Sequence, residues 1–76
     1  MVHAFVMVKT GAGEAESVRD AAMQLEGVID AHVVAGNYDV IAEISGGEVY
    51  DVLHAVSSDI QDISGVTDTK TYVALD

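Results

Sequence analysis

The centre of the sequence is the stretch Val33-Val34-Ala35-Gly36-Asn37-Tyr38-Asp39-Val40-Ile41-Ala42-Glu43-Ile44, in which two runs rich in valine, isoleucine and alanine flank Gly-Asn-Tyr-Asp. Gly36 and Asn37 are residue types that tolerate a positive φ at low steric cost, so they predict the corner of a hairpin. Such a corner directs backbone N–H groups outward. Tyr38 and Asp39 add a phenol and a carboxylate beside it. The corner is therefore a candidate for half of a small-ligand site.

Apolar periodicity divides the rest of the chain into strands and helices. Apolar residues from Val18 to Leu25 follow the spacing of one helix face, and Gly27 is a natural residue to end that helix. A second helix is expected after Ser45 and Glu48, which have the spacing of a capping box. The expected strands cover 2–9, 28–35, 38–44 and 66–75, and the expected helices cover 14–26 and 49–60.

An internal repeat indicates how these elements are ordered. Leu25-Glu26-Gly27-Val28-Ile29-Asp30 matches Ile63-Ser64-Gly65-Val66-Thr67-Asp68 in its Gly, Val and Asp. The common offset superposes the first strand on the third and the first helix on the second. The sequence therefore predicts one α+β domain over 1–76 with the ferredoxin-like order βαββαβ, in which a four-stranded antiparallel sheet carries both helices on one face.

The first expected strand is apolar on both of its faces. Ala4, Val6 and Val8 lie on one face, and Phe5 and Met7 lie on the other. The helices cover only one side of such a sheet, so we expect a second subunit to cover the other side by packing sheet against sheet. A chain of 76 residues without cysteine has few other means of stabilisation.

The charge of the chain is strongly negative, with a formal net charge of −10 at pH 7. This charge disfavours direct binding to nucleic acid and to anionic membranes. Many acidic residues with few lysines are consistent with a halophilic source, where salt screens the charge. No signal peptide and no apolar stretch long enough to span a bilayer is visible, so a cytoplasmic location is expected.

The other candidate sites in the sequence are weaker than the corner. The glycine-rich loop 10–13 lacks the lysine and serine of a phosphate-binding loop, so it is better interpreted as a plain connection. His3, His32 and His54 fall on three different elements with no two at ligand spacing, so neither a metal site nor a cofactor is expected. No residue is assigned a catalytic role.

A second polar feature lies on the last expected strand. Thr67, Thr69 and Thr71 alternate along it and share one face. Threonine is a common strand residue, so the pattern is also compatible with an ordinary strand. Three neighbouring hydroxyl groups nevertheless have the donors and acceptors that bind a zwitterion.

Taken together, the corner and the last strand resemble a known family. Val-Ala-Gly-Asn-Tyr-Asp-Val resembles the Gly-Asp-Tyr-Asp signature of the ligand-binding domain in Lrp/AsnC-type regulators. Gly65-Val66-Thr67-Asp68-Thr69-Lys70-Thr71 resembles the Gly-Val-x-x-Thr-x-Thr ending of the same domain. The similarity covers the whole chain. It departs from the family at Asn37, where aspartate is usual, and the chain shows no helix-turn-helix, as in the stand-alone members.

The resemblance implies a function and an assembly. Members of this family form sheet-to-sheet homodimers that assemble into octamers or similar rings, and an amino acid or similar effector binds between dimers. Carried over to this chain, Gly36, Asn37, Tyr38 and Asp39 would hold the effector, and Asp39 would receive its ammonium group. Thr69 and Thr71 match the family threonines that contact the ligand or shape the site.

The expected function is therefore that of a non-enzymatic module that binds a small amino-acid-like effector, forms oligomers and modulates transcription, through a full-length DNA-binding regulator as partner. One alternative is a small ferredoxin-like dimeric enzyme, such as a cofactor-free monooxygenase or isomerase, with His32 or His54 as a base in a cavity. The few aromatic residues make such a cavity hard to line. Another alternative is a pure assembly adaptor.

Overall fold

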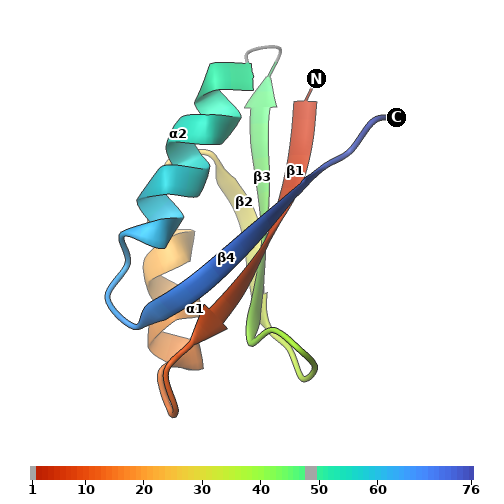
Figure 1. The fold of residues 1–76 in the computed structure, drawn as a ribbon. Coiled ribbons are helices and arrows are strands. Elements are labelled where there is room, and N and C mark those ends of the chain that lie inside the picture. The colour runs from red at the N-terminus through yellow and green to blue at the C-terminus, as the bar shows by residue number, and fades with distance from the viewer. Residues whose placement is uncertain (1, 48–49) are drawn as a thin grey trace.

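The periodicity of the sequence is realised as six elements in the order βαββαβ, which confirms the predicted fold (Figure 1). The structure is a computed structural model that describes residues 2–47 and 50–76. Glu48, the second residue of the expected capping box, lies outside the described residues. The elements are β1 (Val2–Thr10), α1 (Ala15–Met23), β2 (Val28–Val33), β3 (Val40–Gly47), α2 (Tyr50–Gln61) and β4 (Val66–Val73).

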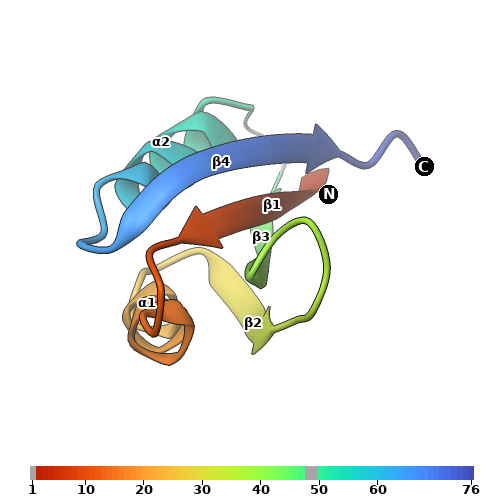
Figure 2. The same ribbon diagram turned by 60° about the horizontal axis from the view of Figure 1, so that its bottom comes forward.

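The four strands form one antiparallel sheet in the order β2-β3-β1-β4, and both helices pack on the same face (Figures 1 and 2). On β1, Val6 is fully buried opposite Ala42 of β3, and its side chain faces the helices. Val18 of α1 and Ile60 of α2 are also fully buried against this face. The core therefore fills the single layer between the sheet and the helices. None of the described helices is long and apolar enough to cross a membrane.

The connection between β2 and β3 differs from the expected tight corner. β2 ends at Val33 and β3 begins at Val40, so the connection runs over residues 34–39. Neither Gly36 nor Asn37 adopts a positive φ, and the prediction of a left-handed corner was wrong. The physical reason is the length of the loop, because a longer connection can reverse direction without a residue in the left-handed region.

The repeated Gly-Val-x-Asp motif has a structural counterpart in each half of the chain. Gly27 and Gly65 have φ values of 97° and 99°, and each ends the turn after a helix, as predicted. Asp30 then accepts a hydrogen bond from the N–H of Ala31 at 2.9 Å, and Asp68 accepts one from the next residue, Thr69, at the same distance. These two aspartates lie near the starts of β2 and β4, which are the two edge strands of the sheet.

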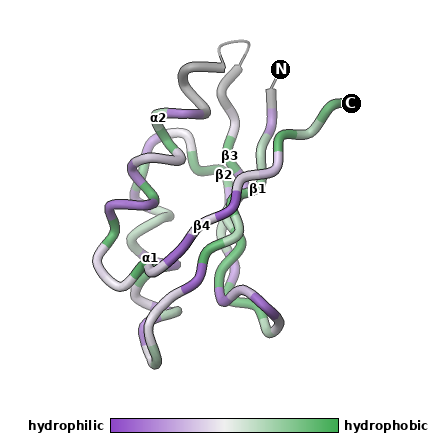
Figure 3. Tube along the Cα trace, in the orientation of Figure 1, coloured by the Kyte–Doolittle hydropathy of each residue, from purple (hydrophilic) through white to green (hydrophobic). Residues whose placement is uncertain are grey.

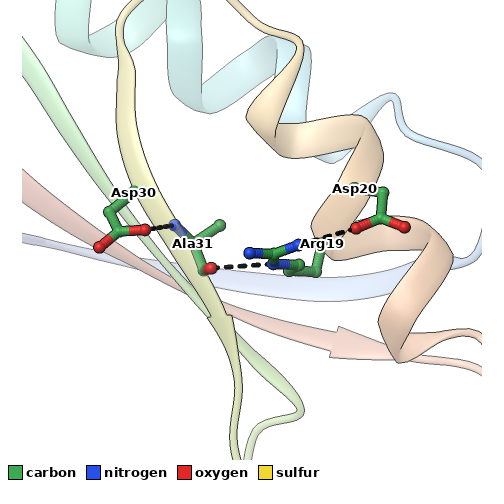
Figure 4. Close-up of polar contacts among 4 residues, drawn as sticks. All are labelled: Arg19, Asp20, Asp30 and Ala31. Atoms are coloured by element: carbon green, nitrogen blue, oxygen red, sulfur yellow. Dashed lines mark hydrogen bonds and ion pairs between the residues drawn. The ribbon is translucent and has the colours of Figure 1, made fainter.

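The two edge strands differ in whether a side chain bonds the carbonyl group of the residue that follows each aspartate. At β2, Arg19 Nε of α1 donates to the carbonyl oxygen of Ala31 at 3.1 Å, so both backbone groups of Ala31 are occupied by side chains (Figure 4). Arg19 also pairs with Asp20 at 2.9 Å. In the second half of the chain, Ser57 of α2 is the residue that corresponds to Arg19. The Ser57 hydroxyl lies 2.9 Å from the hydroxyl of Thr71. The β2 edge is thus closed by side chains in a way that the β4 edge is not.

Asp30, at the β2 edge, makes the stability of the fold depend on pH in a predictable direction. The hydrogen bond with His32, whose Nε2 lies 3.0 Å from Oδ2, and the bond from the Ala31 N–H hold the pKa of Asp30 below its ordinary value. A lowered pKa in the folded state means that ionised Asp30 stabilises the fold above the unfolded-state pKa, and that this stabilisation is lost as the pH falls through the folded-state pKa.

We expect Asp30→Asn, which keeps an acceptor for Ala31, to be less stable than the wild type at pH 7. The difference should shrink toward zero as the pH falls through the lowered folded-state pKa of Asp30. Urea unfolding of both proteins, at pH 7 and at a pH below that pKa, measures this difference in stability. A difference of equal size under both conditions would show that the charge of Asp30 does not stabilise the fold.

Candidate functional site

Backbone hydrogen bonds hold the two ends of the connection over residues 34–39, whereas the tip of the connection is exposed. The N–H of Val34 donates to the carbonyl oxygen of Asp39 at 2.9 Å, and the N–H of Asp39 donates to the carbonyl oxygen of Val8 on β1 at the same distance. Between these bonds, the backbone N–H groups of residues 35–38 donate to no other group among the described residues. Gly36 and Asn37 are exposed. The tip therefore offers hydrogen-bond donors to a ligand or to another chain.

Asp39 has a role that was not foreseen. Its Oδ2 accepts hydrogen bonds from the backbone N–H of Thr10 at 2.9 Å and from the Thr10 hydroxyl at 3.4 Å. These bonds tie the connection to the end of β1. Within the described part of the chain Oδ1 makes no hydrogen bond, so it remains able to accept one from a ligand. Thr10 could not be identified from the sequence, because the contact joins residues far apart along the chain and depends on the β1–β3 register.

The threonines of β4 lie on the face of the sheet that carries the helices. Thr71 is opposite Val6 and Thr69 is opposite Val8, two residues whose side chains are buried under the helices. The Thr71 hydroxyl lies 2.9 Å from that of Ser57 on α2, so its hydrogen bond is internal. Thr69 lines an open depression of about 270 Å³ at the end of α2. The other lining residues are Gln61, Val66, Thr67 and Asp68.

Within one chain, the predicted site residues form two separate groups. The register places Thr69 opposite Val8, and Val8 opposite Val40, the residue that follows Asp39. The connection and Thr69 are therefore at the same end of the sheet, but β1 lies between their strands. The connection also projects away from the helices, whereas Thr71 contacts one (Figures 1 and 2). One chain therefore does not bring the six residues into contact with one another, and their roles stay predictions.

The histidines do not converge on a metal site in the structure. His32 of β2 pairs with Asp30 on the exposed face of the sheet. His3 lies on β1 and His54 on α2, both away from this pair. Among the described residues, no group of three or more potential metal ligands lies close enough to hold an ion.

The sheet face opposite the helices is apolar at its centre and exposed. Phe5 is 38% exposed and lies opposite Tyr72 of β4, which is 53% exposed. Met7 lies opposite Ile41 on β3 in the next row. We call this surface the open face; its charged residues are Lys9, Asp30, Glu43, Asp68 and Lys70, with His3 and His32. Figure 3 shows the apolar stretches along β1 and β3 and the hydrophilic residues along β4.

Comparison with protein families gives one match that covers nearly the whole chain. The family model described as the Lrp/AsnC ligand binding domain matches residues 3–76. A comparison with curated proteins found no match.

Solved structures with the same fold include both short and long proteins. A protein from Thermus thermophilus is 26% identical with a TM-score of 0.91, and the match covers 100% of this chain and 95% of that one. A hypothetical protein from Pyrococcus horikoshii is 28% identical with a TM-score of 0.84, over 99% of this chain and 90% of that one. Escherichia coli AsnC shares the fold at 23% identity with a TM-score of 0.87, over 99% of this chain and 51% of AsnC. The chain thus spans about half the length of AsnC.

Proposed function

This chain belongs to the Lrp/AsnC ligand-binding domain family, and we propose that it is a non-enzymatic sensor that binds a small amino-acid-like effector between dimers and thereby modulates transcription. The family match over residues 3–76 carries this proposal. In the sensor we envisage, the effector connects two dimers of this chain, and a DNA-binding regulator in the cytoplasm is the partner that responds.

The geometry of the connection between β2 and β3 supports an effector site there. A free amino acid presents a carboxylate and an ammonium group. The unused N–H groups of residues 35–38 suit the carboxylate, and Oδ1 of Asp39 suits the ammonium group. Asn37 supplies an amide where the family has a carboxylate, so the effector meets one negative charge fewer. Thr69 of a neighbouring chain is the proposed second half of the site.

A related structure supports the chemical class of the effector. A transcriptional regulator from Neisseria meningitidis, solved as a complex with L-Met, shares the fold at 19% identity with a TM-score of 0.77. This match covers 99% of the present chain and 50% of the regulator. An amino acid is therefore the class of effector to test first.

The open face supports the proposed dimer. Phe5, Met7, Ile41 and Tyr72 form an apolar centre that water covers in a lone chain. Packing this face against a second copy would bury it at a separation of about 10 Å between sheets. An effector that binds between assembled dimers then stabilises the ring, because its affinity for the assembled state is higher than its affinity for separate dimers.

The proposal is tested first by a thermal-shift screen of the twenty amino acids, one at a time at millimolar concentration, followed by light scattering with and without the best hit. We expect at least one amino acid to raise the melting temperature and to increase the assembled mass. A screen in which none of the twenty stabilises the protein would contradict an amino-acid effector.

Asp39 variants then test the site. We expect Asp39→Ala and Asp39→Asn both to weaken effector binding by about 10- to 100-fold, because each removes a charge-assisted hydrogen bond. Calorimetric titration with the amino acid found in the screen measures the affinity. Only Asp39→Ala should also reduce stability, since asparagine keeps an acceptor for Thr10.

The matched control is Asp59→Asn, which removes the charge of an exposed carboxylate on α2. It should leave effector affinity unchanged. If Asp39→Asn binds the effector as tightly as the wild type, the ammonium group is not bound by Asp39.

A further inference from the structure

The outer edge of β4 has backbone groups that point away from the sheet. β4 is the last strand in the order β2-β3-β1-β4, and its partner is β1. The N–H of Ala74 donates to the carbonyl oxygen of His3 at 2.9 Å, which fixes where bonded pairs and unbonded pairs alternate along these two antiparallel strands. The backbone groups of Thr69, Thr71 and Val73 therefore face the edge of the sheet rather than β1.

A side chain closes one of these groups and leaves the others open. Oδ1 of Asp68 accepts a hydrogen bond from the N–H of Thr69 at 2.9 Å. No hydrogen bond within the described residues joins the edge-facing backbone groups of Thr71 or Val73 to another element. On β2, by contrast, side chains bond both backbone groups of Ala31. β4 is therefore the edge that can accept another strand.

The open depression at the end of α2 adjoins this edge. Its lining is mostly polar and comes from Gln61 of α2 and from Val66, Thr67, Asp68 and Thr69 of β4. Successive side chains of a strand point to opposite faces of its sheet, so alternate side chains of a strand added to β4 would lie on the side that carries α2. One of them, beside the start of β4, would reach the depression.

The surroundings of the depression favour a positive charge. Oδ2 of Asp68 makes no hydrogen bond or ion pair in the part of the chain that the structure describes. Lys9 is directly opposite Asp68 on β1 but forms no salt bridge with it. The last turn of α2 contains no basic residue, so no side chain of that turn offsets the negative end of the helix dipole. In a chain with a formal net charge of −10, this end of β4 attracts lysine or arginine.

A second copy of the chain suits this edge less well than a segment of another protein. Antiparallel pairing of two β4 strands about Thr71 places Lys70 opposite the partner's Tyr72. It places Asp68 opposite the partner's Ala74, so no opposite charges are directly paired. Two chains that each carry a formal net charge of −10 also repel each other. A different segment can instead carry a basic residue at the position that the depression favours.

We propose that the β4 edge binds an extended segment of another protein as an added antiparallel strand, with a lysine or arginine of that segment over the depression. Antiparallel pairing is the more stable kind, and it sets the C-terminal end of the segment beside the start of β4. Backbone hydrogen bonds to Thr71 and Val73 supply affinity, and the depression selects the side chain. This interaction is separate from the effector site of the proposed function and uses the edge of the sheet, not the open face.

Two short blocked peptides test the proposal. Both alternate threonine and valine, and one ends in arginine where the other ends in glutamate. We expect the arginine peptide to bind about fivefold more tightly in an NMR titration of the ¹⁵N-labelled protein. At saturation it should slow hydrogen exchange of the Thr71 and Val73 N–H groups by at least about tenfold. N-methylation of one alternating set of peptide amides should abolish binding, because that set faces β4, and N-methylation of the other set should not.

Variants of the protein test the same contacts from the other side. Thr71→Pro removes an edge-facing donor at a position where an edge strand tolerates proline, and it should weaken binding by at least about tenfold. Its control, Thr71→Val, keeps the N–H group and should bind the peptide as the wild type does. Asp68→Asn keeps an acceptor for Thr69 and should remove most of the preference for arginine. Glu16→Gln, which removes the charge of an exposed residue on α1, should leave that preference intact.

Three results would overturn the proposal. Binding that survives N-methylation of either set, or exchange at Thr71 and Val73 that the peptide does not slow, would exclude strand addition even if Thr71→Pro does not fold. Exchange at these two amides that slows as the concentration of the protein alone is raised would show that a second copy occupies the edge. Equal affinity for the two peptides would show that the depression does not select a basic side chain.

Discussion

Gly27→Ala is expected to be among the most destabilising single substitutions in this protein. Gly27 has a φ of 97°, and a Cβ added there would lie 2.7 Å from Cγ2 of Val56 on α2. Val56 is only 5% exposed, so it has little room to move. Left-handed backbone costs about 1–2 kcal/mol for a residue with a side chain, and overpacking adds about 1–3 kcal/mol. We expect a loss of about 2–5 kcal/mol and a fall in melting temperature of at least about 10 °C.

Two other glycines distinguish the cost of the left-handed backbone from the cost of the contact with Val56. Gly13 has a φ of 77° with nothing within 4 Å of an added Cβ, so Gly13→Ala measures the backbone cost alone. Gly36 has neither a positive φ nor a close neighbour, so Gly36→Ala should be near neutral. Chemical unfolding at one protein concentration compares the three variants. If Gly27→Ala is no more destabilised than Gly13→Ala, the approach of Val56 to Gly27 does not constrain the fold.

Phe5→Glu is expected to convert the proposed dimer into a monomer. Phe5 is at the centre of the open face, between Glu43 and Tyr72 on the neighbouring strands. Burying a fully exposed phenylalanine stabilises an interface by about 1.5–3 kcal/mol, and the 38% of Phe5 that is still exposed accounts for about 0.5–1 kcal/mol of this in each of the two copies. The substitution also buries a third carboxylate beside Glu43 and Asp30 in each chain, and a buried unpaired charge costs several kcal/mol. We expect dimer affinity to fall by about two to four orders of magnitude, as measured by analytical ultracentrifugation.

Leu75→Glu is the matched control, since it makes the same kind of change at a leucine that is 99% exposed and lies beyond the end of β4. It should leave the association unchanged. Equal weakening by both variants would show that added negative charge, rather than loss of the apolar centre, separates the chains. A Phe5→Glu protein that is still dimeric would place the interface elsewhere.

The order of the elements could be predicted because each boundary has a local cause. Gly27 and Gly65 end helices through their own conformational freedom, and the alternation on β1 puts Val6 and Phe5 on opposite faces, which the structure shows to be the buried and the exposed face. The connection between β2 and β3 was mispredicted for the opposite reason. Gly36 and Asn37 permit a tight corner, but bonds between Val34, Asp39 and β1 set the loop that forms.

The candidate site was less predictable than the fold. The sequence located residues 36–39 as one segment because they are contiguous, and its first two residues, Gly36 and Asn37, are exposed. It gave no indication that Oδ2 of Asp39 bonds Thr10, or that the Thr71 hydroxyl bonds Ser57, because both contacts depend on which strands and helices become neighbours. Residue types alone also did not show that both lysines share the open face, which follows from the register of β1 and β4.

The side chains that bond the backbone groups of Ala31 also affect aggregation. Fibril growth requires each added molecule to present a free strand edge to the next. At the β2 edge, the Ala31 N–H and carbonyl are already bonded to Asp30 and Arg19, so an incoming strand finds neither group free. Two molecules that join through their β4 edges would leave only β2 edges at the ends of the combined sheet. Edge-to-edge growth is therefore expected to end at a pair, and Arg19→Ala, which frees the Ala31 carbonyl but not its N–H, should weaken that limit.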